Sequence, residues 1–98
     1  MLRNKAKPMS DERAAEIGIA ALGYLADQPE GLARFLELSG ISLPQLRDDA
    51  GTPMIQSALL EHLLGEESLL LAFASDRGLA VDDVANAAAW LGGYERSY

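Results

Sequence analysis

A repeat of 38 residues limits, more than any other feature, how this chain can fold. When the sequence is shifted by 38 positions, apolar residues and a turn glycine fall on residues of the same kind, while most charged positions differ. Phe35 meets Phe73, and Gly40 meets Gly78. The other identical pairs include Ile17 with Ile55, Ala20 with Ala58, Leu22 with Leu60, Leu25 with Leu63 and Ala50 with Ala88. Because core and turn positions are the ones repeated, the pattern predicts a structural unit that occurs twice in the chain. It indicates little about chemistry.

Six helices account for the body of the chain, and no strand is needed. Apolar residues recur at helical spacing, and glycines, prolines and capping residues separate the segments. The expected helices cover residues 11–26, 29–39, 43–50, 54–64, 66–77 and 82–91. A length of 98 residues suits one hydrophobic core. We therefore expect an all-α fold: a compact single-domain bundle of about six short helices in two pseudo-symmetric three-helix halves. This domain should span residues 10–93, between a flexible basic arm (1–9) and a flexible tail (94–98).

Local signals mark the helix ends. Ser10 and Thr52 are of the residue types preferred as N-caps. Pro29 and Pro53 suit the first turn of a helix, so they predict where the second and fourth helices begin. Gly40 suits the left-handed conformation that often closes a helix.

Three further expectations concern packing. Gly18 and Gly23 each lower helix propensity by about 1 kcal/mol, so another helix should approach the first helix closely at these positions. In the fourth helix, Gln56 falls on the polar side of the helical wheel. The fifth helix is apolar almost all round over residues 69–74, and a helix of this kind is normally central in its bundle.

The charge of the chain is acidic and unevenly distributed. The formal net charge is −7, from eight basic and fifteen acidic residues, but Arg3, Lys5 and Lys7 stand in the leading arm. Residues 8–98 therefore hold five basic and fifteen acidic residues, a formal charge of −10. A body of this sign repels phosphate backbones and membrane surfaces, and it suits a basic partner. With no cysteine, no signal-peptide pattern and no long apolar stretch, we expect a cytoplasmic protein without disulfides or a membrane span.

A DNA-binding helix-turn-helix is the alternative function with the most motif support. Residues 74–79 followed by Val84 have the alanine, glycine and apolar spacing of such a corner, and residues 36–46 repeat much of it. These requirements are structural, whereas reading DNA also needs Arg, Lys, Asn or Gln on the second helix. That helix begins with Asp82 and Asp83 in the second copy. The charge therefore disfavours nucleic acid, and mainly the basic arm favours it.

His62, the only histidine, lies within the apolar arc of the fourth helix. Glu66 follows four residues later, a spacing that allows one metal ion to bind both, but Gly65 interrupts the helix between them. We therefore expect a half-buried histidine near a helix C-terminus, hydrogen-bonded to a carbonyl. A small enzyme or metal-binding protein that uses carboxylates and His62 is the second alternative. The adjacent carboxylates Asp48 and Asp49 point apart on a helix, so adjacency alone makes no acid–base pair.

Trp90 follows three alanines in the last helix. A tryptophan in this setting most often fills the core. If it is exposed instead, Trp90 and Tyr94 together would form an aromatic anchor for a partner or a second subunit. Trp90, Tyr94 and His62 are therefore the candidate partner-binding residues.

Three stretches of the chain resemble a family of small bacterial proteins, chiefly alphaproteobacterial, whose function is unknown. The stretches are residues 20–27 (AALGYLAD), 34–40 (RFLELSG) and 62–73 (HLLGEESLLLAF). They are packing and turn motifs that extend over most of the body and exclude both ends. The resemblance implies a bacterial cytoplasmic helical domain, and it brings no activity, cofactor or catalytic residue with it.

No motif points to catalysis. The sequence contains no Ser/His/acid trio, no glycine-rich phosphate loop and no nucleophile elbow. By elimination, we expect a non-enzymatic protein-interaction or regulatory module without a cofactor, whose partner is another protein or a second copy of the chain.

Overall fold

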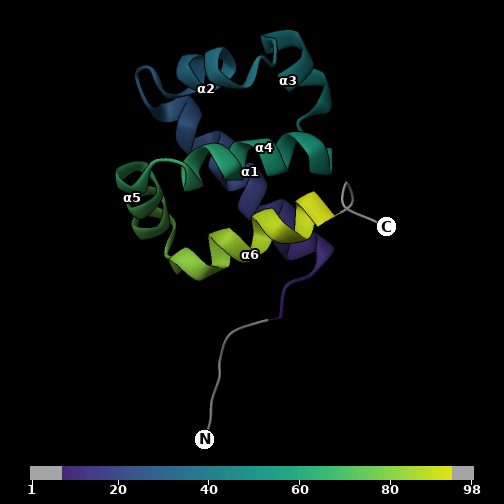
Figure 1. Cartoon of the computed structure of the whole chain (residues 1–98), viewed down its shortest axis with the longest axis vertical. Helices are drawn as coiled ribbons and strands as arrows, with labels where there is room; N and C mark the ends of the chain where they lie inside the picture. Colours follow the sequence, from purple (N-terminus) through teal and green to yellow (C-terminus); the bar gives the residue numbers. More distant parts are fainter. Residues whose placement is uncertain (1–7, 94–98) are drawn as a thin grey trace, which may run out of the picture.

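The computed structural model describes residues 8–93, and six α-helices with no strand occupy that part of the chain (Figure 1). The helices are α1 (Asp11–Asp27), α2 (Gly31–Ser39), α3 (Leu43–Asp49), α4 (Pro53–Leu64), α5 (Glu67–Arg77) and α6 (Val81–Gly92). The predicted all-α fold is therefore confirmed. Residues 1–7 and 94–98, and with them Tyr94, the tail and most of the basic arm, lie outside the described part. None of the described helices has both the length and the apolar character that crossing a membrane requires.

Hydrogen bonds at the helix ends confirm most of the predicted boundaries. The side chains of Ser10, Ser42 and Thr52 each accept a hydrogen bond from the backbone N–H three residues later. Gly40 and Gly78 close α2 and α5 with left-handed backbone angles, φ 77° and 67°, and no other described residue has a positive φ. These two glycines are equivalent in the repeat, so both copies turn from their second to their third helix in the same way.

The predicted start of the second helix at Pro29 is wrong. The helix begins at Gly31, after Glu30 as N-cap. Gln28 is extended, and its N–H donates to the Leu25 carbonyl at 3.1 Å, so it ends α1. Because a residue before proline is pushed toward extended backbone, the Gln28–Pro29 pair forms the corner between the two helices.

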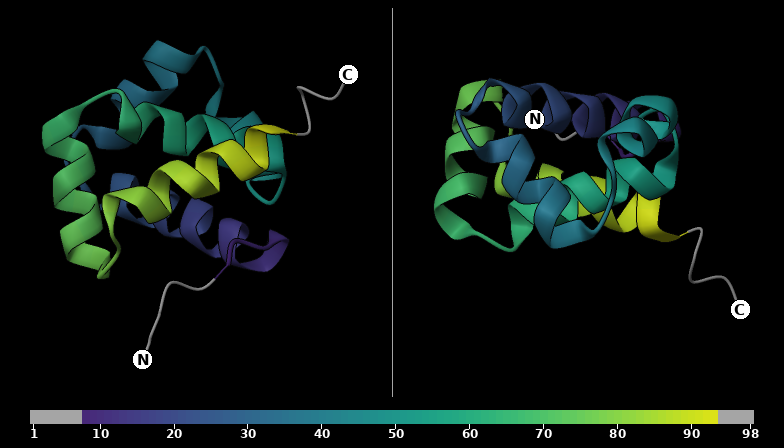
Figure 2. Two further views of the ribbon diagram at one scale, coloured as in Figure 1. Left: turned by 60° about the horizontal axis from the view of Figure 1, so that its bottom comes forward. Right: turned by 90° about the horizontal axis from the view of Figure 1, so that it is seen from above.

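α1, α4 and α6 form the centre of the fold. α4 and α6 lie side by side, α1 packs against both, and α5 stands across one end of the three (Figure 2). α2 and α3 lie on the side of α4 that faces away from α6 (Figure 1). The largest fully buried side chains come from five of the six helices and are Leu25, Phe35, Ile55, Leu59, Leu60, Leu63, Phe73 and Val84.

The prediction that the fifth helix is central is wrong. Leu71 is 50% exposed and Ala72 is exposed, and the helix buries Leu70, Phe73 and Ala74. Because α5 stands at the end of the bundle, helices cover it on one side only. α4 takes the central place instead.

The crossing of α1 and α4 explains one glycine of α1 and not the other. A Cβ atom on Gly18 would lie 2.8 Å from Cβ of Gln56, so the predicted close approach is confirmed there. Gly23 is exposed, and its Cβ would meet only a guanidinium nitrogen of Arg77 at 3.7 Å, so the same prediction is wrong at Gly23. Gly18 and Gln56 are equivalent positions in the repeat. Equivalent positions of two helices meet where a two-fold axis passes between them.

Two aromatic contacts obey the same pseudo-two-fold relation. Tyr24 of α1 packs edge to face against Phe73 of α5, with ring centroids 5.5 Å apart. The equivalent residues, His62 of α4 and Phe35 of α2, pack in the same manner at 5.4 Å. Each copy therefore packs its first helix against the second helix of the other copy, and His62 takes the structural place of Tyr24.

The third helices of the two copies differ. α3 has 7 residues and buries Leu46 alone, whereas α6 has 12 residues and buries Val84, Ala87, Ala88 and Leu91. α6 covers both α1 and α4, while α3 lies outside that central group (Figure 1). The pseudo-symmetry thus describes the first two helices of each copy and ends at the third.

Candidate binding surface

Trp90 lies on the surface, at 44% exposure, so the expectation that it fills the core is wrong. The buried stripe of α6 consists of Val84, Ala87, Ala88 and Leu91. Two alanines in this stripe allow α6 to approach α1 and α4 closely. Trp90 precedes Leu91 by one residue, so its side chain points to one side of the buried stripe. A large side chain at that position reaches the edge of the α1–α6 contact and not its interior.

A hydrogen bond fixes the indole ring of Trp90 on this edge. Its Nε1–H donates to Oδ1 of Asp11 at 2.8 Å, across 79 positions of the sequence. Asp11 is the first residue of α1, where the helix dipole favours a carboxylate. The tryptophan is thereby tied to the start of α1 while much of its ring stays accessible.

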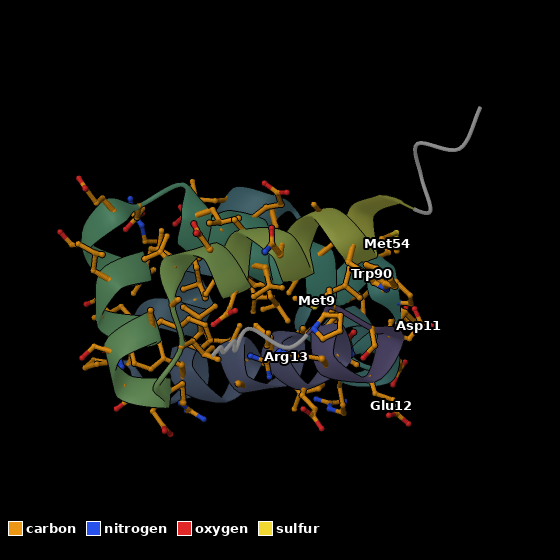
Figure 3. The ribbon with its side chains drawn as sticks, turned by 90° about the horizontal axis from the view of Figure 1, so that it is seen from below. Met9, Asp11, Glu12, Arg13, Met54 and Trp90 are labelled. Atoms are coloured by element: carbon orange, nitrogen blue, oxygen red, sulfur yellow. The ribbon has the colours of Figure 1, made fainter. Side chains whose placement is uncertain are left out.

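Both methionines of the described part lie at the same end of the molecule as Trp90. Met54, near the start of α4, is 51% exposed, and Met9, just before α1, is partly buried. Figure 3 shows Met9, Trp90 and Met54 at this end, with Asp11 next to Trp90 and Glu12 following it in the first turn of α1. We call the apolar group of Met9, Met54 and Trp90, bordered by Asp11 and Glu12, the Trp90 surface.

A cavity of about 230 Å³ opens at the same end of the molecule. Its lining includes chain neighbours of Met54 and Trp90, and consists of Asp11, Ala15, Gly51, Pro53, Gln56 and Leu91. It therefore lies between the start of α1, the turn before α4 and the end of α6. The Trp90 surface thus continues into a concave region.

Gln56, predicted on the polar side of its helix, is buried, with 3% of its surface exposed. Its Nε2 donates to the Ala50 carbonyl at 3.1 Å. The prediction is wrong because α1 crosses α4 at this position and encloses the side chain, whose amide then reaches back to the turn after α3. Gln56 therefore holds the turn that forms one wall of the cavity, and the helical wheel of α4 alone gave no signal of it.

The charges around the Trp90 surface are predominantly negative. Residues 8–93 hold four arginines, no lysine and fourteen carboxylates. Three of the arginines form ion pairs elsewhere, and the pairs are Arg13 with Asp83 (3.9 Å), Arg34 with Glu66 (3.0 Å) and Arg77 with Asp76 (2.9 Å). The last turn of α6, which ends beside this surface, contains no basic residue.

His62 lies on another part of α4, next to α2, and is half-buried as predicted. Its Nε2 atom is buried without a hydrogen-bond partner, so the predicted carbonyl contact is not made by that nitrogen. Burial lowers the pKa of His62 below its usual value, while Glu66 opposes this shift and Arg34 adds to it. A neutral imidazole that packs against Phe35 explains why His62 is half-buried here without a partner for Nε2. His62 and Trp90 do not share a site.

The described residues contain no group of three or more His, Cys, Asp and Glu side chains that could hold a metal ion. Glu66, the ligand that sequence spacing suggested beside His62, accepts a hydrogen bond from Nε of Arg34 at 3.0 Å. Among the described residues, no third ligand lies beside His62 and Glu66, and Arg34 is the hydrogen-bond partner of Glu66.

The corner between α5 and α6 has the backbone turn that a helix-turn-helix needs. The Leu79 N–H donates to the Ala74 carbonyl at 2.8 Å across the left-handed Gly78. The outward face of α6 carries Asp82, Ala85, Asn86, Ala89 and Trp90. This face has one amide and no basic side chain for phosphates or base edges.

The chain belongs to a family described as protein of unknown function (DUF3572), which matches residues 11–94. The match includes all six helices and agrees with the resemblance in the sequence to a family without a known activity. No curated protein and no solved structure matches the chain.

Proposed function

We propose that this member of the DUF3572 family is a non-enzymatic protein-interaction module that binds its partner through the Trp90 surface. The observation that carries the proposal is the half-exposed position of Trp90, the only tryptophan, at the same end of the molecule as two methionines. Tryptophan is enriched among the few residues that supply most of the binding energy of protein interfaces. Burial of its remaining apolar surface by a partner would be favourable.

The local structure prepares this residue for binding. The hydrogen bond to Asp11 holds the indole before any partner arrives, so less side-chain freedom is lost on association. Met54 and Met9 are flexible and polarizable, and such side chains adapt to the shape of an apolar partner. The cavity beside them offers a place for a protruding side chain.

Charge and geometry favour this function over the two alternatives. A DNA-binding protein would need cations on the outward face of α6, where Asp82 and Asn86 stand. An enzyme would need polar groups that converge on one cavity. In the cavity beside Trp90, Asp11 and Gln56 are the polar side chains, and each already has a hydrogen-bond partner.

Affinity capture from an extract of the native cell tests the proposal. The full chain is compared with Trp90→Ala and with Leu71→Ala, a control that truncates a similarly exposed apolar side chain at the opposite end of the bundle. We expect the wild type and Leu71→Ala to recover the same protein, and Trp90→Ala to lose it. Circular dichroism spectra of the three chains establish that the variants are folded.

Equal recovery of that protein by a folded Trp90→Ala chain would refute the Trp90 surface as the binding site. Loss of it by both variants would show that recovery depends on exposed apolar area in general, which also contradicts the proposal.

A further inference from the structure

The chemistry of the Trp90 surface narrows the kind of partner it fits, if the proposed function holds. We infer that the partner presents a basic amphipathic helix, with apolar side chains against Trp90 and Met54 and with lysine or arginine beside Asp11 and Glu12. The inference depends on the acidic border of an apolar, methionine-containing surface.

The apolar part of the surface is small and adaptable. Met54 and Trp90 are each about half exposed, and the lining of the cavity beside them includes Pro53 and Leu91. A surface of this kind accepts a row of apolar side chains from one face of a helix. Methionine accommodates different side chains without a fixed shape, so the exact apolar residues of the partner matter less than their spacing.

The charged part of the surface selects against acidic partners. Asp11 and Glu12 stand in the first turn of α1, and Asp11 is the one that lies beside Trp90. Arg13 is the nearest cation in sequence, and it is directed to Asp83 of α6 at 3.9 Å. Residues 8–93 have a formal charge of −10, so their field attracts a basic segment and repels an acidic one.

The exposed surface of Trp90 gives a second reason for a cation. A lysine or arginine over an indole ring is attracted by the negative face of the ring, most strongly for tryptophan among the aromatic residues. α6 ends at Gly92, two residues after Trp90, so the negative end of its helix dipole lies close by. No basic residue in the last turn of α6 offsets it. These effects act in the same direction as the carboxylates of α1.

A pair of synthetic peptides tests the inference on the full chain. One is an amphipathic helix of leucine and lysine, about five turns long, and the other has glutamate in place of every lysine. Neither contains tryptophan, so the single indole N–H resonance of the protein reports directly on Trp90. We expect the lysine peptide to shift this resonance saturably, with an affinity that falls as salt rises, and the glutamate peptide to leave it unchanged.

Two charge reversals separate the Trp90 surface from the acidic body as a whole. Glu12→Lys changes the border of the surface, and Glu67→Lys makes the same change in the first turn of α5, at the other end of the bundle. We expect Glu12→Lys to weaken binding of the lysine peptide by about fivefold, and Glu67→Lys to weaken it by less than about twofold.

Several outcomes would overturn the inference. Equal weakening by both reversals would show attraction to the acidic body alone, and equal binding of the glutamate peptide would show that charge selects nothing. A failure of both peptides to shift the indole resonance would also overturn it. All three leave the proposed function to be judged by the capture experiment, in which the loss of a recovered protein by Trp90→Ala does not depend on the charge of the partner.

Two other occupants of the surface are identified by the same resonance. A shift that depends on protein concentration, together with sedimentation as a dimer, would show that a second copy covers Trp90. A shift on deletion of residues 1–7, which include Arg3, Lys5 and Lys7, would show that the chain covers it with its own arm. Either result would replace the basic partner.

Discussion

Two glycines in one helix predict opposite effects of the same substitution. Gly18 and Gly23 both lie in the interior of α1, and alanine is about 1 kcal/mol better than glycine in a helix interior. At Gly23 the added Cβ meets only the end of the Arg77 side chain at 3.7 Å, an ordinary contact. We therefore expect Gly23→Ala to raise the free energy of unfolding by about 0.5–1 kcal/mol. The melting temperature should rise by about 4 °C.

At Gly18 the added Cβ would lie 2.8 Å from Cβ of Gln56 and 3.1 Å from its Cγ. Cβ is tied to the α4 backbone, so α1 and α4 would have to move apart. Overpacking of this kind lowers stability by about 1–3 kcal/mol, which exceeds the gain in propensity. We expect Gly18→Ala to lower the free energy of unfolding by about 1 kcal/mol, and the melting temperature by about 5 °C.

Thermal and urea unfolding, followed by circular dichroism at the helix band, measure both variants against the wild type. A double-mutant cycle with Gln56→Gly adds a control, because this change removes the atom that Gly18→Ala meets. The coupling between the two substitutions should be favourable by about 1 kcal/mol. If Gly18→Ala stabilises the chain as much as Gly23→Ala does, or if the coupling is zero, the close crossing of α1 and α4 is not what position 18 requires.

Five other substitutions test the turns, a helix cap and the histidine. Gly40→Ala and Gly78→Ala should each destabilise the chain by about 1–2 kcal/mol in urea unfolding, because alanine is strained at positive φ, whereas Gly51→Ala, with open space and no positive φ, should be close to neutral. Thr52→Ala should lower stability by about 1 kcal/mol in the same assay, because the side chain caps α4. Because the pKa of His62 is lowered in the folded chain, His62 takes up a proton at higher pH in the unfolded chain than in the folded one. The free energy of unfolding should therefore be unaffected by titration of His62 above about pH 6.5 and should decline below it. Urea unfolding across pH should show this decline in the wild type and not in His62→Phe.

Local signals in the sequence are sufficient to predict the six helices and most of their ends, the start of α2 excepted. Ser10 and Thr52 cap helices, and Gly40 turns left-handed, because each of these roles depends on a few neighbouring residues. The other wrong predictions depend on long-range contacts. Gln56 is polar on its own helical wheel, yet α1 encloses it. Leu71 belongs to an apolar helix, yet that helix stands at the end of the bundle (Figure 2), and Leu71 is 50% exposed.

Trp90 is a further residue whose burial depends on long-range contacts, and here the sequence predicts a buried residue that is exposed. A tryptophan among alanines predicts a core residue, because nothing in the local sequence says that the alanines themselves form the buried stripe. Its hydrogen-bond partner lies 79 positions away, beyond any local pattern. The repeat gave the one indirect signal, since Trp90 falls where the two copies are not alike.

The repeat separates the core of this protein from the surface proposed to bind. Most core positions are apolar in both copies, and the pairs that meet across the pseudo-two-fold axis are themselves equivalent. The apolar members of the Trp90 surface have polar counterparts 38 positions away, and the pairs are Met9 with Arg47, Met54 with Glu16 and Trp90 with Thr52. α3 ends at Asp49, before the position equivalent to Trp90, so this part of α6 has no counterpart helix. Because the duplicated packing does not require Met54 and Trp90, stability of the repeated core gives no reason for both to be exposed at one end of the molecule, whereas a partner that covers them does.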